Sequence, residues 1–314
     1  MEGSKFAVWG AIAANVAIAV IKFVVAGITG SSAMLSEGIH SLVDTGNGTL
    51  LLIGMKRSQR AATREHPFGH GKELYFWSLI VAVLIFGLGG GISFYEGVMH
   101  MRQPIELKDP MWNYIVLGSA ALFEGTSFAI SLRQFNSQRG DVSFWRALHA
   151  SKDPANYTVL AEDFAALVGL AVAAIGIYLS HLLDMPQLDG AASMVIGLLL
   201  AGVAILLIRE SRGLLVGEGV KPETAEVIRA MASEETDVQH AGPVLSMYIG
   251  AEEVLVTFDV TFDGDTPARR VADAIRRIEG RIRERFPKIQ RIYIEVVTNA
   301  AQPSPAVAAA ERSP

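Results

Sequence analysis

The chain has 314 residues, of which 51% are hydrophobic and a further 30 are glycine, while only 19% are charged. This composition excludes a disordered chain and argues against an ordinary soluble enzyme. The formal net charge of −5 offers no basic surface for nucleic acid, and the absence of cysteine excludes disulfide bonds and thiolate metal ligands.

The charged residues are unevenly distributed along the chain. Long stretches before Arg209 carry almost none, whereas the segment from Arg209 to Glu295 is dense with them. We therefore predict a membrane domain over residues 1–208 and a small soluble domain over residues 209–299. Residues 300–314 have no periodic apolar face, so we predict a disordered tail there.

The first 208 residues contain six stretches of the length that a helix needs to cross a bilayer, about 20 residues. They are residues 6–28, 33–55, 74–98, 112–132, 156–179 and 188–208. The first stretch ends without a cleavage-like signal, so we expect it to be retained as a helix. The sequence therefore predicts a membrane α-helical fold with six transmembrane helices, integral to the lipid bilayer.

Lysine and arginine residues set the expected orientation of these helices. They are concentrated in the second-to-third connection, in the fourth-to-fifth connection and just after the sixth helix. The other three connections hold only Arg102 and Lys108. Because positive charges favour the cytoplasmic side, we expect both termini in the cytoplasm.

The soluble domain shows helical and strand patterns in alternation. Amphipathic runs predict helices over residues 222–233 and 267–286, and β-branched runs predict strands over residues 244–249, 254–262 and 291–297. The order helix, strand, strand, helix, strand predicts a compact α+β module with helices on one face of a small sheet.

The second predicted helix carries ionisable residues inside the membrane. His40 and Asp44 are four residues apart and therefore lie on one face, which Asn47 extends. A charged side chain at the bilayer centre costs at least ~2–3 kcal/mol, so such residues indicate function. The alternative is that they hold helices together by hydrogen bonds.

The fifth predicted helix carries two adjacent carboxylates, Glu162 and Asp163, which point about 100° apart. An imidazole and carboxylates from two helices make the kind of nitrogen and oxygen site that binds Zn²⁺ or a similar divalent ion. We predict His40, Asp44 and Asp163 as ligands. Further candidate ligands are Asn47, Glu162 and Asn156, the last lying seven residues before Asp163.

Three other polar features indicate function less strongly than these ligands do. Glu124, inside the fourth helix, is a candidate for proton relay or for a structural hydrogen bond. Lys22, in the first helix, is expected to pack or to extend toward the membrane surface. In the second-to-third connection, Glu65, His66 and His70 form either a weak metal site or an incidental cluster.

The string from His40 to Asp44, together with His66-Pro67-Phe68-Gly69-His70-Gly71-Lys72, resembles the cation diffusion facilitator family. The resemblance covers nearly the whole chain. It implies a ferredoxin-like C-terminal domain, a homodimer, and export of a divalent transition metal, most often Zn²⁺, in exchange for protons, without an organic cofactor. In that family, His40 and Asp44 match the second-helix ligands and Asp163 matches the second fifth-helix ligand.

The chain departs from the family pattern at three places. Val159 replaces the His or Asp that most members have four residues before the position of Asp163. Thr63 replaces an acidic residue of the loop motif, with Glu65 as a substitute, and the C-terminal metal cluster of some relatives has no counterpart. The chain looks most like the branch of the mitochondrial zinc transporter of animals and its bacterial relatives, so we expect a bacterial inner membrane.

We therefore predict a secondary antiporter in which protons and a divalent ion compete for one site. Mn²⁺, Fe²⁺, Co²⁺ and Cd²⁺ are alternatives to Zn²⁺. The soluble domain would dimerise without metal, through its sheet and through Val271, Ile275 and Ile278. Lys72 and Glu218 would form an ion pair between the two domains.

Two rival functions use the same intramembrane residues. A membrane-embedded metalloenzyme would need an open metal position, but the chain has no His-Glu-x-x-His motif. A metal-sensing scaffold would bind the ion without moving it. Flux across sealed vesicles separates both rivals from a transporter.

Overall fold

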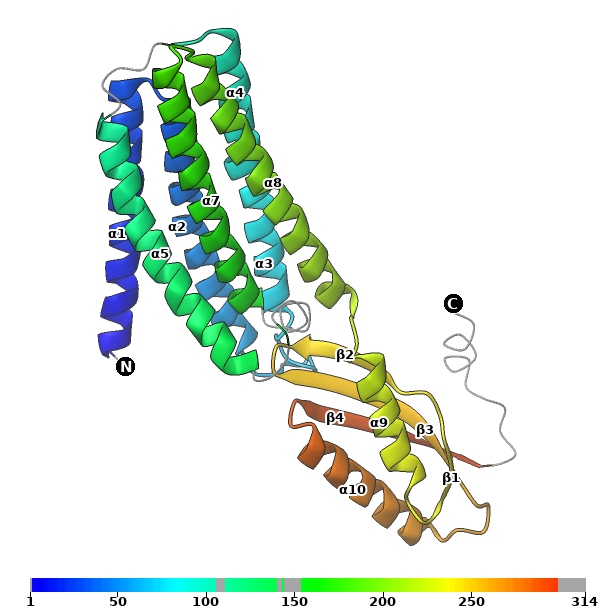
Figure 1. The fold of residues 1–314 in the computed structure, drawn as a ribbon. Helices are drawn as coiled ribbons and strands as arrows, with labels where there is room; N and C mark the ends of the chain where they lie inside the picture. Colours follow the sequence, from blue (N-terminus) through cyan, green and yellow to red (C-terminus); the bar gives the residue numbers. More distant parts are fainter. Residues whose placement is uncertain (1, 106–110, 140–142, 144–153, 299–314) are drawn as a thin grey trace. The chain divides into compact units, whose positions relative to one another are not determined.

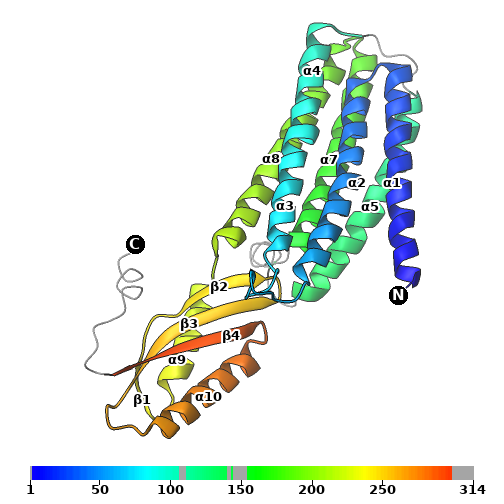
Figure 2. The same cartoon turned by 180° about the vertical axis from the view of Figure 1, so that it is seen from behind.

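The computed structural model of the chain describes residues 2–105, 111–139, 143 and 154–298. For residues 2–14, 134, 138, 139, 154–157 and 298 it describes the backbone alone. The predicted tail over residues 300–314 lies outside the described residues. The chain forms two compact units, shown from two sides in Figures 1 and 2. They are Met1–Lys56 with Glu73–Arg212, and Arg57–Lys72 with Gly213–Pro314.

The first unit is a bundle of long helices (Figure 1). Its elements are α1 (Glu2–Thr29), α2 (Ser32–Ser58), α3 (Glu73–Leu84), η1 (Ile85–Gly91), α4 (Ile92–Arg102), α5 (Met111–Arg139), α7 (Pro154–Leu182) and α8 (Gln187–Val216). Each matches one predicted stretch, except that the third stretch is divided into α3, the π-helix η1 and α4. The predicted membrane α-helical fold is confirmed.

Four segments in the described part of the chain are long and apolar enough to cross a membrane. They are Glu73–Arg102, Met111–Ser137, Thr158–Leu182 and Gln187–Val216, with a shorter apolar helix over Asn15–Thr29. The helix α2 does not meet this criterion. Its polar and ionisable side chains, among them most of the candidate ligands, lower its mean hydropathy.

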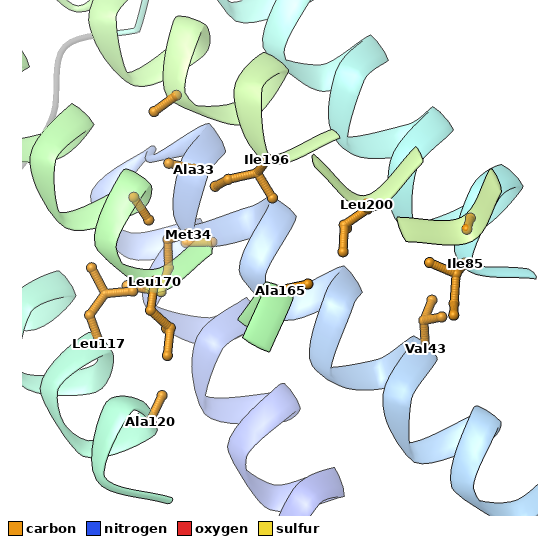
Figure 3. Packing of buried hydrophobic residues seen from close by; sticks show 14 of the residues in the cluster. Ala33, Met34, Val43, Ile85, Leu117, Ala120, Ala165, Leu170, Ile196 and Leu200 are labelled. Atoms are coloured by element: carbon orange, nitrogen blue, oxygen red, sulfur yellow. The ribbon is translucent and has the colours of Figure 1, made fainter. Parts of the chain in front are cut away.

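The helices of the first unit bury small and branched apolar side chains between them. Figure 3 shows part of this cluster, with Met34, Leu117 and Leu170 contributed by α2, α5 and α7. Large apolar side chains also cover the outside, including Ile28 on α1 and Leu122 on α5. An apolar exterior around an apolar interior is the arrangement expected of helices surrounded by lipid.

Glycines bring α8 into backbone contact with the third membrane segment. Gly90 and Gly97 lie seven residues apart on η1 and α4, and Gly190 and Gly197 lie seven apart on α8. A Cβ atom at Gly97 would lie 2.6 Å from the Gly190 carbonyl oxygen, and one at Gly197 would lie 2.6 Å from the Phe94 nitrogen. Close packing of small residues is a common way for membrane helices to associate, and larger side chains would separate these two.

The second unit contains a four-stranded mixed sheet with two helices. Its elements are α9 (Pro222–Ser233), β1 (Val238–Ala241), β2 (Leu245–Gly250), β3 (Glu253–Phe262), α10 (Ala268–Arg285) and β4 (Ile289–Thr298). The central strand β3 pairs antiparallel with β1 and β2 on one edge and parallel with β4 on the other. The sequence did not predict β1, because its four residues show no alternation of buried and exposed positions.

The core of the second unit lies between β3 and the two helices. Alternate residues of β3 are buried, among them Val256 and Phe258, and they pack with α9 and α10. Ile278 is fully buried in this core, and Val271 and Ile275 pack against it. The prediction that Ile278 forms a dimer interface is therefore wrong, because its side chain is buried within the protomer, whereas the parts of Val271 and Ile275 in an interface stay predictions.

Candidate metal centre

A stripe of polar side chains runs along one face of α2. Glu37, His40, Asp44 and Asn47 are spaced by three or four residues, which places them one above another in a helix. His40 and Asn47 are buried, and Asp44 is half-buried. The His40 Nε2 and Asp44 Oδ2 atoms are 3.4 Å apart. The structure therefore brings the two predicted α2 ligands together.

Several buried atoms of this stripe have no hydrogen-bond partner among the described residues. They are both ring nitrogens of His40, Oδ1 of Asp44, Oδ1 of Asn47 and Oε1 of Glu37. A buried polar atom without a partner usually costs about 1–3 kcal/mol, so native proteins keep few of them. A cluster of such atoms is available to bind a cation or protons.

The two adjacent carboxylates of α7 contact different helices. Asn47 Nδ2 on α2 donates to Oε1 of Glu162 at 2.9 Å. Ser127 and Ser131 on α5 donate to Oδ2 of Asp163 at 3.0 and 3.2 Å. Neighbouring side chains of a helix point about 100° apart, as these two do. Glu162, and not Asp163, therefore faces α2.

The other candidates occupy different surroundings. Glu124 on α5 is half-buried, and its charge interacts with those of Asp44 and Asp163. Val159 is 37% exposed in the protomer. The Asn156 side chain lies outside the described residues. Within the described ranges, no three His, Asp or Glu side chains come close enough together to hold a metal ion.

The structure places Lys22 in the interior of the bundle, in an ion pair with Glu37 that the sequence pattern did not predict. Its side chain is 1% exposed, and Nζ donates to Glu37 Oε2 at 3.1 Å and to Ser41 Oγ at 2.8 Å. Of the two predicted roles of Lys22, packing is therefore confirmed, and extension toward the membrane surface is wrong. Sequence reasoning also missed Glu37, although its position one turn before His40 on the same face was a usable signal.

A second buried polar cluster lies at the N-terminus of α2. Asp189 on α8 accepts hydrogen bonds from the Ser32 and Ala33 amides and from the Ser31 and Ser32 hydroxyls, at 2.6 to 3.3 Å. The carboxylate thereby caps α2 and complements its dipole. His100 Nε2 on α4 lies 3.8 Å from Asp189 Oδ2. We call these residues the Asp189 cluster.

The predicted loop site belongs to the second unit. The side chains of Glu65 and His66 are exposed, and the rings of His66 and His70 are 4.6 Å apart between centroids. His70 Nδ1 is 3.1 Å from the Ala61 carbonyl oxygen. Arg291 on β4 lies 5.4 Å over the ring of Phe68, so the loop packs on the sheet of its own unit.

Lys72 and Glu218 both belong to the second unit, so a contact between them would not join the two units. Lys72 Nζ donates to the Leu215 carbonyl oxygen at 3.3 Å. The backbone carbonyl of Glu218 accepts from the Tyr248 amide at 3.0 Å. The ion pair between Lys72 and Glu218 stays a prediction.

Comparison with protein families identifies the family to which the helical unit belongs. Residues 8–216 match the model described as the cation efflux transmembrane domain, which is about two thirds of the chain. The chain belongs to the cation efflux family. This is the cation diffusion facilitator family that the motifs predict, so that prediction is confirmed. Members of the cation efflux family are cation transporters, which excludes the membrane-embedded metalloenzyme.

Several proteins of the cation efflux family are similar over most of the chain. The proton-coupled zinc antiporter SLC30A9, mitochondrial, of Homo sapiens is 32% identical over 243 residues, covering 77% of this chain and 43% of that protein. Metal tolerance protein C4 of Arabidopsis thaliana is 30% identical over 269 residues, covering 84% and 58%. The chain thus spans less than two thirds of the length of these relatives.

A bacterial relative covers more of its own length. The magnetosome protein MamM of Paramagnetospirillum magneticum is 25% identical over 301 residues, covering 93% of this chain and 88% of that protein. Among solved structures, the C-terminal domain of MamM in a nickel form matches 25% of this chain and 99% of its own, with 9% identity and a TM-score of 0.24.

Proposed function

We propose that this chain transports a divalent transition-metal cation, first of all Zn²⁺, across a membrane in exchange for protons. The observation that carries the proposal is the set of unpartnered buried ligand atoms on α2, beside the Glu162 carboxylate of α7. His40 and Asp44 supply nitrogen and oxygen from one helix. Glu162 and Asp163 are the carboxylates that a neighbouring helix offers.

The donor atoms favour Zn²⁺ over harder ions. Zn²⁺ in proteins takes imidazole nitrogen and carboxylate oxygen in tetrahedral sites, whereas Mg²⁺ and Ca²⁺ prefer oxygen alone. The human relative supports the same choice, since that protein, 32% identical to this chain, is named as a zinc antiporter. Geometry and donor type leave Mn²⁺, Fe²⁺, Co²⁺ and Cd²⁺ as alternative substrates.

The charges around the site support proton exchange. The carboxylates that interact there are Glu37, Asp44, Glu124, Glu162 and Asp163, and the only ammonium among their interaction partners in the described residues is that of Lys22. With His40 neutral and every carboxylate ionised, this cluster would carry a net charge of −4, which burial inside the membrane disfavours. A divalent ion changes this charge by two. Because uncompensated charge is costly in a bilayer, departure of the ion requires two protons if the charge is to stay constant.

Reconstitution in sealed proteoliposomes tests the proposal. Zn²⁺, Mn²⁺, Fe²⁺, Co²⁺ and Cd²⁺ are offered in turn under an imposed pH gradient, with fluorescent reporters of metal and of pH inside the vesicles. We expect Zn²⁺ flux that is coupled to opposite proton movement and that collapses with the gradient. A folded protein that binds the ions and moves none of them would overturn transport and favour the metal-sensing scaffold.

The orientation and the host membrane are part of the same proposal. The distribution of lysine and arginine supports cytoplasmic termini, and we propose the bacterial inner membrane as the host. Protease digestion of intact, inside-out and right-side-out vesicles tests this orientation. We expect cleavage of the second unit only where the cytoplasmic face is accessible.

We also propose a homodimer that forms through the second unit. The helices cover one face of its sheet, and the register places Leu245, Met247, Leu255 and Tyr293 together on the other face. Three of these apolar side chains are exposed in the protomer, Tyr293 by 52%. Burial of such a patch would stabilise an interface. We expect the full chain to remain dimeric in detergent with a chelator, and Met247→Asp with Tyr293→Asp to make it monomeric.

A further inference from the structure

We propose that Glu37 is a second binding station for the transported ion, and that Lys22 is a tethered cation which occupies this station until the ion arrives. The inference rests on the proposed transport function and assigns roles to two residues outside the ligand set. It follows from the ion pair in the bundle interior, from an unpartnered oxygen on Glu37, and from the position of Glu37 on α2.

The ammonium of Lys22 is held by two groups of α2. Its Nζ atom is 3.1 Å from Glu37 Oε2 and 2.8 Å from Ser41 Oγ, and both side chains of the ion pair are almost fully buried. Its charge also interacts with those of Asp44 on α2 and Glu124 on α5. Lys22 therefore already lies within the field of the proposed metal site.

Glu37 uses only part of its binding capacity for Lys22. Its Oε1 atom is buried and has no hydrogen-bond partner among the described residues. This oxygen points toward α7, where a Cβ atom at Gly169 would lie 2.6 Å from it. The glycine leaves room for a carboxylate with one free oxygen between α2 and α7, and a free buried oxygen is a cation ligand.

The position of Glu37 makes it a station on the path of the ion. It lies three residues from His40 and seven from Asp44 on the same face, nearer to the N-terminus of α2. In the proposed orientation, that end of α2 is opposite to the cytoplasm. An ion that leaves His40 and Asp44 for the far side thus meets Glu37 next.

The exchange keeps the charge of the cluster constant. When the ion moves to Glu37, the ammonium of Lys22 releases that carboxylate and moves past Ser41 toward Asp44. Ser41 lies on the turn between Glu37 and Asp44 and already binds the ammonium. Each of the two carboxylates keeps a cation partner throughout, so neither is left as an unpaired charge in the membrane.

The stability of the variants decides which of them can be used to test transport. Replacing both partners of a buried ion pair by neutral groups of similar size is often neutral for stability, whereas removing one partner leaves a buried charge unpaired. The double variant Lys22→Met with Glu37→Gln is therefore expected to fold. The single variant Lys22→Met is expected to be less stable, because Glu37 then lacks its counter-ion.

The decisive measurement compares Zn²⁺ binding and Zn²⁺ flux in this double variant. We expect calorimetry to give a dissociation constant within about threefold of wild type, because His40 and Asp44 are unchanged. We expect flux in proteoliposomes to fall by about tenfold or more, because the second station is lost. Glu37→Asp, which keeps the carboxylate, should retain more flux than Glu37→Gln.

Ser36→Ala provides the matched control. Ser36 is buried on the same turn of α2, but its hydroxyl lies 2.8 Å from that of Ser193 on α8, so its hydrogen bond is outside the ion pair. It should leave flux unchanged. Wild-type flux in the double variant would overturn the second station while leaving the transport function intact. Absence of Zn²⁺ flux in the wild-type protein would instead overturn the transport function.

Discussion

The Asp189 cluster and the stripe on α2 both bury polar side chains in the helical unit, and they differ in how completely their carboxylates are hydrogen-bonded, although His100 Nε2 of the Asp189 cluster also has no hydrogen-bond partner among the described residues. In the Asp189 cluster, both carboxylate oxygens accept hydrogen bonds from the first turn of α2 and from the serines beside it. In the stripe on α2, His40, Asp44 and Asn47 keep buried atoms without partners among the described residues.

This difference distinguishes a buried carboxylate that stabilises the fold from buried polar groups that serve transport. A satisfied carboxylate at a helix N-terminus stabilises the fold, because it replaces the water that the backbone amides would otherwise need. Carboxylates that repel one another lower the stability of the folded protein, and so do buried ring nitrogens without a hydrogen-bond partner. Such a cluster is tolerated where a bound ion or bound protons complete it. Mutations should therefore act on stability at Asp189 and on transport along the stripe.

The largest effect is expected from Asp44→Asn. The substitution removes an anionic ligand beside His40, so we expect Zn²⁺ flux to fall by more than the ~10–100-fold that outer-shell substitutions cost. The thermal midpoint should stay the same or rise, because Glu162 and Glu124 no longer repel a third carboxylate. Flux in proteoliposomes and a melting curve in detergent measure both effects. Wild-type flux from the folded variant would contradict the ligand assignment.

Asp189→Ala is expected to have the opposite profile. The amides of Ser32 and Ala33 lose their acceptor, which should lower the free energy of unfolding by at least ~2 kcal/mol. Denaturant titration in detergent measures the loss. The folded fraction should bind Zn²⁺ as wild type does, since Ser32, which Asp189 caps, lies about two turns before His40 on α2. A stable variant with no Zn²⁺ binding would make the Asp189 cluster part of the site.

A smaller effect should separate the two carboxylates of α7. Glu162→Gln removes the carboxylate that accepts from Asn47, and we expect about tenfold weaker Zn²⁺ binding. Asp163→Asn should weaken binding less, because Asp163 faces Ser127 and Ser131 on α5 and not α2. Calorimetry on both variants gives the order. The reverse order would return Asp163 to the leading role that the sequence motif predicts.

The smallest effect is expected in the second unit. The imidazoles of His66 and His70 lie beside each other at the surface, and in the described part of the chain no third His, Asp or Glu side chain joins them as a ligand. His66→Ala with His70→Ala should change Zn²⁺ flux by less than about threefold. A loss as large as that of Asp44→Asn would show that the loop delivers the ion.

Local sequence determined several features because each depends on residues close together in the chain. The apolar stretches predict the membrane helices, and a spacing of four residues is sufficient to bring His40 and Asp44 together on α2. The strand and helix patterns of the second unit likewise predict its α+β fold. The short strand β1 escaped prediction because its pairing with β3, rather than its own pattern, makes it a strand.

Contacts between distant segments were decided only by the tertiary structure. The sequence shows that Glu162 and Asp163 diverge, but only the packing of α2 and α5 against α7 decides which helix each one meets. The same holds for Lys22, which binds Glu37 because α1 packs against α2. Helical periodicity fixes which residues share a face, whereas the partner of that face depends on how whole helices associate, and no local pattern encodes that.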